Sequence, residues 1–204
     1  MLEKLIVFVE EISMEAALEG LLPKMLGDVE FQIIRFQCKD DLLKQLPARL
    51  RAYSRWLPDN HAILVLVDRD DDDCIVLKSK LEQIALQSNM TTKTQNPIRF
   101  QVVNRIVIEE LESWFFGDWD AVKAAYPRVN DGVPRKQQYR DPDAIRGGTW
   151  EALERELKRS GYFSTGLRKL ECARDIGQHM NPEQNRSASF NAFARAVDSM
   201  LLGS

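Results

Sequence analysis

An apolar run that ends abruptly in acidic residues constrains the fold of this chain more than any other feature. Residues 62–68 read AILVLVD, and RDDDD follows directly. A continuous run of branched apolar residues is typical of a strand that is buried on both faces, as in a parallel sheet covered by helices. The segment therefore predicts an α/β protein.

Three other segments share this apolar character, at residues 5–10, 30–38 and 99–108. Helical patterns separate them, at residues 13–21, 42–56 and 75–86, and Pro23 is expected to stop the first of these helices. A succession of strands and helices in this order favours parallel pairing. We therefore expect a mostly parallel four-stranded sheet flanked by helices.

The sequence becomes helical beyond the fourth strand. After a helical segment at 109–116, Asp118 is expected to cap a short helix, and residues 128–146 form a polar loop. Three helical patterns follow, at 150–158, 167–180 and 190–201. We predict an α/β domain over residues 1–117 and a helical C-terminal extension, residues 118–204, packed on it.

Composition narrows the class of protein. The 28 Lys and Arg residues nearly balance the 31 Asp and Glu residues, which excludes a histone-like binder but allows a local basic surface. The three cysteines lack CxxC spacing, which argues against a zinc ribbon or a disulfide framework. Apolar runs fall far short of the ~20 residues that cross a bilayer, and we expect no secretory signal. The chain is expected to be cytoplasmic.

Carboxylates stand where the predicted strands end. Glu10 and Glu11 follow the first strand, and Asp68 and Asp70 follow the third. Functional groups of open α/β sheets collect at the carboxyl ends of the strands. If these two strands are neighbours, their carboxylates converge and repel one another unless a cation neutralises them. Carboxylate oxygens suit Mg²⁺ or Mn²⁺.

A further acidic group follows the fourth strand, where Glu109 and Glu112 are expected on one face of a helix. Two metal ions held by such groups can activate a water and stabilise the leaving oxygen in phosphodiester cleavage. The competing interpretation is that these acids cap helices and interact with the helix macrodipole.

Residues 68–79 share features with two other acidic motifs. An EF-hand loop is excluded, because its sixth position is Asp73 rather than glycine and its twelfth is Ser79 rather than glutamate. A phosphatase of the haloacid-dehalogenase type, with Asp68 as nucleophile, stays open, although its DxDGT sequence is absent and its motif normally lies on the first strand.

The segments VEEISME (9–15), LVLVDRDDDD (64–73) and IEELESWFF (108–116) resemble Toprim domains, which occur in topoisomerases, primases and the OLD and RloB-like nucleases. Over the whole chain the sequence resembles a bacterial Toprim-like family of unassigned function, through RFQVVNRIVIEELESWFFGD, AYPRV and GGTWEALE. Glu11 departs from the motif, which has glycine there.

The resemblance implies roles for individual residues. Glu10 would be a general base or metal ligand, and Asp68 and Asp70 would be metal ligands. Further ligands would be Glu112 and, less directly, Glu15. Lys169 matches a lysine that would stabilise charge on the cleaved phosphate.

The resemblance also implies partners. Nucleic acid, with DNA preferred over RNA, would be the substrate, and an ABC-type ATPase would be a partner in phage defence. The polar loop adds Arg135, Lys136 and Arg140 as candidate contacts to the nucleic-acid backbone.

The sequence thus leads to three hypotheses. The first is a Toprim-fold, Mg²⁺-dependent nuclease that acts as an effector in phage defence or repair. The second is a non-catalytic module that binds metal or nucleic acid and serves an ATPase partner. The third is the phosphatase-like hydrolase. The oligomeric state does not follow from the sequence.

Overall fold

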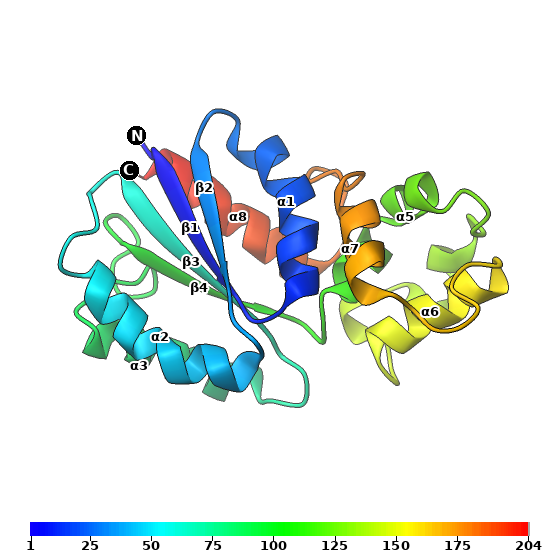
Figure 1. Ribbon diagram of the computed structural model, residues 1–204, viewed down its shortest axis with the longest axis horizontal. Helices are drawn as coiled ribbons and strands as arrows, with labels where there is room; N and C mark the ends of the chain where they lie inside the picture. The colour runs from blue at the N-terminus through cyan, green and yellow to red at the C-terminus, as the bar shows by residue number, and fades with distance from the viewer. Residues whose placement is uncertain (204) are drawn as a thin grey trace. The chain divides into compact units, whose positions relative to one another are not determined.

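Within residues 1–203, which the computed structural model describes, the chain forms one four-stranded sheet and eight α-helices (Figure 1). The sheet has the order β2-β1-β3-β4, and the bounds of its strands are β1 (Lys4–Val9), β2 (Glu30–Arg35), β3 (His61–Asp68) and β4 (Val102–Val107). The predicted α/β class and four-stranded parallel sheet are confirmed.

Parallel pairing holds β1 at the centre of the sheet. Its Lys4 pairs with Glu30 of β2 on one side and with His61 of β3 on the other, and both registers continue to Val9. Because strands in parallel pairs run the same way, β1, β2 and β3 end at one edge of the sheet. Whatever follows each strand is brought to that edge.

Helices α2 (Lys39–Tyr53) and α3 (Cys74–Gln87) cover one face of the sheet (Figure 1). They bury apolar side chains at the three- to four-residue spacing of one helical face. These meet alternate residues of the strands, because successive strand residues point to opposite faces. The resulting core includes Phe8, Val65, Val67, Leu46 and Leu81.

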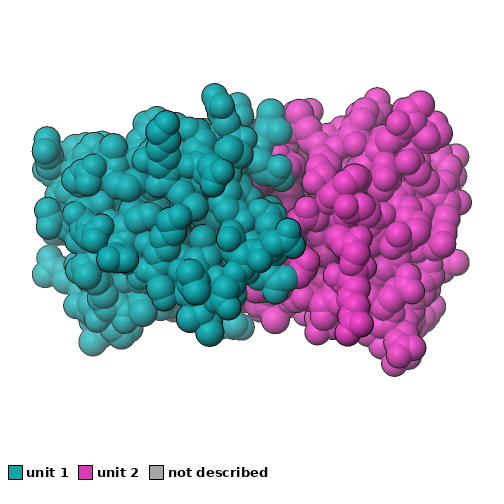
Figure 2. Space-filling model, turned by 90° about the horizontal axis from the view of Figure 1, so that it is seen from below, with its two compact units in different colours: residues 1–12, 26–106, 193–204 teal, residues 13–25, 107–192 magenta. Residues whose placement is uncertain are grey.

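The chain divides into two compact units, which Figure 2 colours separately. Unit 1 consists of residues 1–12, 26–106 and 193–204, and unit 2 of residues 13–25 and 107–192. The domain boundary predicted after residue 117 stays a prediction, because compact units of one structure need not be independently folding domains.

Unit 2 is helical. It contains most of α1 (Ile12–Leu26) and the beginning of α8 (Ala188–Leu202), together with α4 (Glu112–Gly117), α5 (Trp119–Ala125), α6 (Thr149–Arg159) and α7 (Lys169–Gly177). Its core contains Trp114, whose ring meets Phe190 edge to face and whose Nε1–H donates to Ser189 Oγ at 3.0 Å. Asp118 caps α5 as predicted, by accepting from the Ala121 N–H.

Two local expectations are wrong. Helix α1 continues through Pro23, because Leu21 and Leu22 are fully buried and Lys24 donates to two carbonyls near the end of α7. These contacts offset the roughly 3 kcal/mol cost of an interior proline. Glu109 does not share a helical face with Glu112, since its φ is +62° and α4 begins only at Glu112.

Among the helices of residues 1–203, none combines the length and the apolar character that a membrane span requires.

Candidate active site at the carboxyl edge of the sheet

Glu10 and Asp68 lie side by side because β1 and β3 are adjacent and parallel. Both side chains are buried, with exposed fractions of 7% and 4%. The Asp68 backbone N–H donates to Glu10 Oε1 at 3.3 Å, across the two strand ends. The structure thus brings together two of the acids that the sequence places after buried strands.

The carboxylates of the acidic turn after β3 have different hydrogen-bond partners. The Asp72 N–H donates to the Arg69 carbonyl at 3.0 Å, and Asp70 adopts a left-handed φ of +48° that is uncommon outside glycine. Asp73 caps α3, since its Oδ1 accepts from the N–H groups of Ile75 and Val76. Helix capping therefore explains Asp73, and Asp70 and Asp72 have another partner.

That partner is Lys39, the first residue of α2. Its Nζ lies 2.6 Å from Asp70 Oδ2 and 2.9 Å from Asp72 Oδ2, and it donates to the Arg69 carbonyl at 3.0 Å. Only 14% of its side chain is exposed, whereas the two aspartates are half exposed. Lys39 thus binds the turn after β3 to the helix after β2.

The charges of this cluster shift its pKa values. Burial lowers the pKa of Lys39, but its hydrogen bonds with Asp70 and Asp72 outweigh burial, and the pKa lies above the ordinary value. The same hydrogen bond from Lys39 lowers the pKa of Asp72. Lys39 is therefore a charged ammonium group at neutral pH.

Glu10 has the opposite shift. Burial, followed by the nearby charge of Asp70, raises its pKa from the ordinary value of 4.5 to about 7, against the lowering effect of Lys39. Its Oε2 atom is buried and has no hydrogen-bond partner among the described residues. Buried polar atoms are rarely left unpaired, so Glu10 Oε2 is a candidate contact for a ligand. A carboxyl group with a pKa near neutral pH can also exchange a proton with a substrate or a water.

The residue types fit a divalent cation. Glu10, Asp68 and Asp70 offer carboxylate oxygens, and the unpaired Glu10 Oε2 could bind one directly. The geometry is not preassembled, since residues 1–203 contain no group of three His, Cys, Asp or Glu side chains close enough to hold a metal ion. Asp70 Oδ2 pairs instead with Lys39, so a cation bound at this oxygen would compete with the ammonium group.

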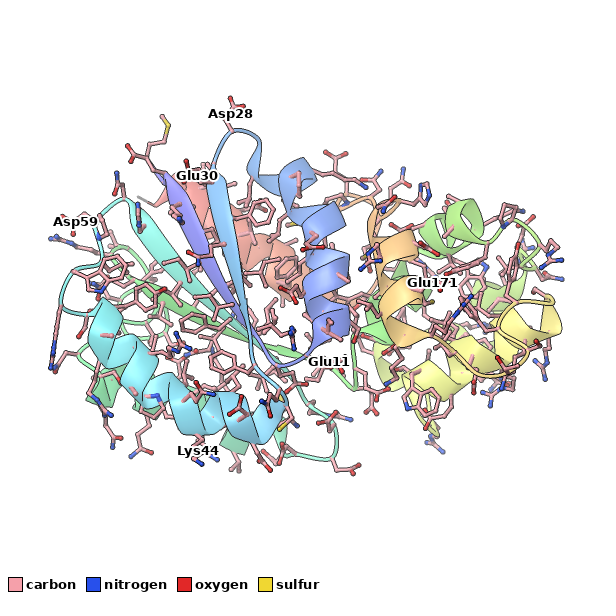
Figure 3. The ribbon with its side chains drawn as sticks, viewed as in Figure 1. Glu11, Asp28, Glu30, Lys44, Asp59 and Glu171 are labelled. Atoms are coloured by element: carbon pink, nitrogen blue, oxygen red, sulfur yellow. The ribbon has the colours of Figure 1, made fainter. Side chains whose placement is uncertain are left out.

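Glu11 occupies the position where the Toprim motif has glycine. Its φ of −142° and ψ of 167° are extended, so the backbone does not require glycine. The side chain is partly exposed where β1 leads into α1 (Figure 3). Glutamate is therefore compatible with the fold at this position.

The other predicted acids, Glu15 and Glu112, belong to unit 2. Glu15 is a partly exposed residue in the first turn of α1, while Glu112 is 3% exposed in the first turn of α4. The charge of Glu112 contributes, after burial, to a raised pKa of the Cys172 thiol. Glu112 therefore lies in a buried, polar part of unit 2.

Lys169 contacts the start of α6, also within unit 2. Its Nζ lies 4.8 Å from the centre of the Trp150 ring and 4.0 Å from Glu110 Oε1. The other oxygen of Glu110 accepts from Thr149 Oγ1 at 2.9 Å and from the Trp150 N–H at 3.3 Å, and so caps α6. These contacts place the Lys169 ammonium group beside the start of α6.

The predicted basic loop contains three short 3₁₀ turns, Val133–Arg135, Gln137–Tyr139 and Pro142–Ala144. Arg135 and Arg140 are exposed, and Arg140 Nε donates to the Arg135 carbonyl at 3.4 Å. Lys136 instead pairs with the buried Glu156 at 2.7 Å. Only the two arginines of this trio are thus fully available to a partner.

Lys39 is the site residue that sequence reasoning missed. The predicted site contains acids that follow the first, third and fourth strands and no residue that follows the second. The position of Lys39 after the second predicted strand could have identified it, since a polar residue that follows any strand of a parallel sheet lies near the same edge. A lysine close to the acids that follow β1 and β3 is a candidate partner for them.

Comparison with known proteins finds one family. Residues 9–198 match the family described as "Domain of unknown function (DUF4276)". No curated protein and no solved structure matches the chain significantly.

The raised pKa of Glu10 predicts a pH dependence of stability. Below the unfolded pKa of 4.5 the carboxyl is neutral in both states, and this stabilisation is fully present. It is lost as the pH rises through about 7, because the folded state must then bury a charge. With EDTA present, we expect Glu10 to lower the free energy of unfolding by about 3 kcal/mol across this range.

Urea denaturation of the protein and of Glu10→Gln from pH 4.5 to 7.5 measures this loss. The Gln variant should lack it, whereas Glu30→Gln, which removes an exposed carboxyl of β2 (Figure 3), should retain it. Identical pH profiles for the wild type and Glu10→Gln would contradict the assignment.

Proposed function

The chain belongs to the DUF4276 family, and we propose that it is a Toprim-type, divalent-cation-dependent nuclease that hydrolyses phosphodiester bonds of nucleic acid. The observation that carries the proposal is the Glu10 carboxyl: it is buried, its pKa is raised to about 7, and its Oε2 is unpaired. It lies beside Asp68 at the edge of the sheet where functional groups of such folds collect.

Glu10 would act as the general base or as a cation ligand. With a pKa near 7, the carboxylate form is available at neutral pH and can accept a proton from the attacking water. Protonation after attack is also inexpensive, because the neutral form suits its buried position. General bases of this kind contribute typically 10²- to 10⁴-fold to the rate.

Asp68 and Asp70 would hold Mg²⁺ or Mn²⁺ together with Glu10. When bound, such an ion supplies charge stabilisation for the phosphate and lowers the pKa of a coordinated water. In the proposal, Glu15 and Glu112 are further ligands, Lys169 stabilises charge on the cleaved phosphate, and Arg135, Lys136 and Arg140 contact the nucleic-acid backbone.

Lys39 would have two roles at the acidic edge, one without a cation and one with the substrate. Without a cation it neutralises Asp70 and Asp72, which would otherwise repel each other and Glu10. If Asp70 held a cation, the Lys39 ammonium group would keep Asp72 as a partner and would have a donor for a phosphate oxygen of the substrate, for which lysine is a common ligand.

The setting proposed for this activity is a cytoplasmic effector of phage defence or repair that acts on DNA in preference to RNA, with an ABC-type ATPase as partner. The second candidate is a non-catalytic module that serves such a partner. The ion pairs of Lys39 favour it, because they hold the acidic turn without a metal. The phosphatase-like alternative needs an accessible Asp68, which is 4% exposed.

The direct test is incubation of the purified chain with supercoiled plasmid and with total RNA, in Mg²⁺, Mn²⁺ or EDTA. We expect metal-dependent cutting that falls at least about 100-fold in Glu10→Gln, the range that general acid–base groups contribute. Cutting should also be lost in Asp70→Asn, because a metal ligand is removed. Glu30→Gln should cut normally. Cutting that persists in both site variants would contradict the proposal, and absence of any cutting would favour the non-catalytic module.

Lys39→Met is expected to change metal binding and cleavage in opposite directions. Loss of the ammonium group removes a charge that repels the cation, so Mn²⁺ should bind more tightly. Cleavage should fall about tenfold or more, because a charge-assisted contact to the phosphate is lost. Calorimetry of Mn²⁺ binding and a plasmid-cleavage assay measure the two effects.

Two controls sharpen this test. Lys44→Met removes an exposed lysine of the same helix (Figure 3) and should change neither quantity. Lys39→Arg keeps the charge and should restore part of the cleavage. If Lys39→Met weakened Mn²⁺ binding and cleavage together, Lys39 would be only a structural support of the turn.

A further inference from the structure

A second polar cluster of unit 1 lies beside the edge strand β4. There a pocket of about 120 Å³ is lined by Lys78 and Glu82 of α3, by Lys93 of the following connection and by Arg105 of β4. Three cationic side chains thus surround a pocket that has one carboxylate. This surplus of positive charge is not part of the acidic edge described above.

Hydrogen bonds connect Lys78, Glu82 and Asn104, which line this pocket. Lys78 Nζ donates to the Asn104 carbonyl and lies 2.7 Å from both that oxygen and Glu82 Oε1. The Asn104 Nδ2 donates to the same Glu82 oxygen at 2.9 Å. Glu82 Oε1 is therefore shared between two donors, and Glu82 Oε2 is buried with no hydrogen-bond partner among the described residues. The charge of Glu82 raises the pKa of Lys78 and of Arg105, so this carboxylate offsets part of the positive charge of the three cations.

The cations of the pocket destabilise one another. Burial lowers the pKa of Lys78, Lys93 and Arg105, and the charge of Arg105 lowers the pKa of both lysines further. After burial, Arg195 of α8 has the same effect on Arg105. Partly buried like charges are costly unless an anion approaches them.

Asn104 gives an independent sign of a missing ligand. Its side chain is fully buried and lines the pocket, and its Oδ1 has no hydrogen-bond partner among the described residues. A buried acceptor of this kind calls for a donor. The hydroxyl of a monoanionic phosphate, or a sugar hydroxyl next to a phosphate, can supply one.

We propose that this pocket is a phosphate-binding site. Its volume of about 120 Å³ would hold several waters, since one water needs at least about 10–15 Å³, and a tetrahedral oxyanion can replace them. Lys93 and Arg105 supply the charge, and Asn104 supplies the acceptor for a hydroxyl. Two sources present this chemistry: a small phosphate compound, or a phosphate of nucleic acid.

The nucleic-acid source rests on the proposed nuclease function and fits the position of the pocket. Helix α3 begins directly after the acidic turn, and Lys78 is its fifth residue. A helix rises 1.5 Å per residue, so about 6–8 Å of helix axis separate the start of α3 from the pocket. A strand of a few nucleotides, at about 3.4 Å of axis each, spans this length.

Calorimetry with inorganic phosphate, at constant ionic strength and in EDTA, tests the site without involving metal or cleavage. Lys93→Gln should weaken phosphate binding about tenfold, the loss of one charge-assisted hydrogen bond. Glu82→Gln should strengthen it, because Glu82 supplies the carboxylate among the described residues that line the pocket. Lys44→Gln, an exposed lysine of α2, should leave it unchanged.

The two variants are expected to change phosphate affinity in opposite directions, which a general loss of structure would not do. Lys93 is the safest position for the fold, since its ammonium group lies above the Phe100 ring rather than in the buried triad. If Glu82→Gln fails to fold, Lys93→Gln and Lys44→Gln still carry the comparison. Absence of phosphate binding to the wild type, or equal binding to wild type and Lys93→Gln, would overturn the proposal.

Competition against inorganic phosphate then separates the two sources. Asp70→Asn is titrated with a 5′-phosphorylated trinucleotide and with its 5′-hydroxyl twin, again in EDTA. Competition by both identifies a backbone phosphate, competition by the phosphorylated one alone identifies a terminal phosphate, and competition by neither identifies a small phosphate compound. Phosphate binding in a chain that cuts no nucleic acid would support the pocket while the proposed nuclease fails.

Discussion

The parallel pairing of β1 with β3 is the constraint on which the rest of unit 1 depends. Both strands are buried on both faces, so their polar continuations can emerge only at the ends. Pairing from Lys4 with His61 onward then forces Glu10 and Asp68 to the same edge. The buried and raised-pKa state of Glu10 is a direct consequence of the same apolar pairing that stabilises the sheet. The pairing of β1 with β3 therefore both stabilises the sheet and creates the buried position of Glu10.

Lys39 shows how the chain manages the resulting density of negative charge. It pairs with Asp70 and Asp72 and leaves the buried Glu10 Oε2 without a partner. In the proposed function, a cation held by Glu10 and Asp70 would compete with this ammonium group for the Asp70 carboxylate. The edge of the sheet would then have two arrangements of its charges, the one held by lysine that the structure has and one held by metal.

Sequence reasoning succeeded where backbone periodicity decides the outcome. The apolar runs that contain Val7 and Val65 predicted the strands, and the ends of parallel strands predicted that Glu10 and Asp68 meet. It did not foresee contacts in which a long side chain pairs with a residue that is distant in the sequence. Lys136 pairs with Glu156, twenty residues away, and Lys39 reaches Asp70 thirty-one residues away. Such contacts depend on tertiary packing and, at Asp70, on an uncommon backbone angle that no local pattern signals.

The central claim is that the carboxyl edge of the sheet binds a divalent cation through Glu10, Asp68 and Asp70. Titration with Mn²⁺, followed by the paramagnetic resonance signal of the free ion, measures this binding without a substrate. The account predicts one Mn²⁺ site per chain that Mg²⁺ displaces, that Asp68→Asn and Asp70→Asn abolish, and that Glu30→Gln leaves intact. Absence of binding to the wild type, or binding to Asp68→Asn and Asp70→Asn that is as tight as binding to the wild type, would contradict it.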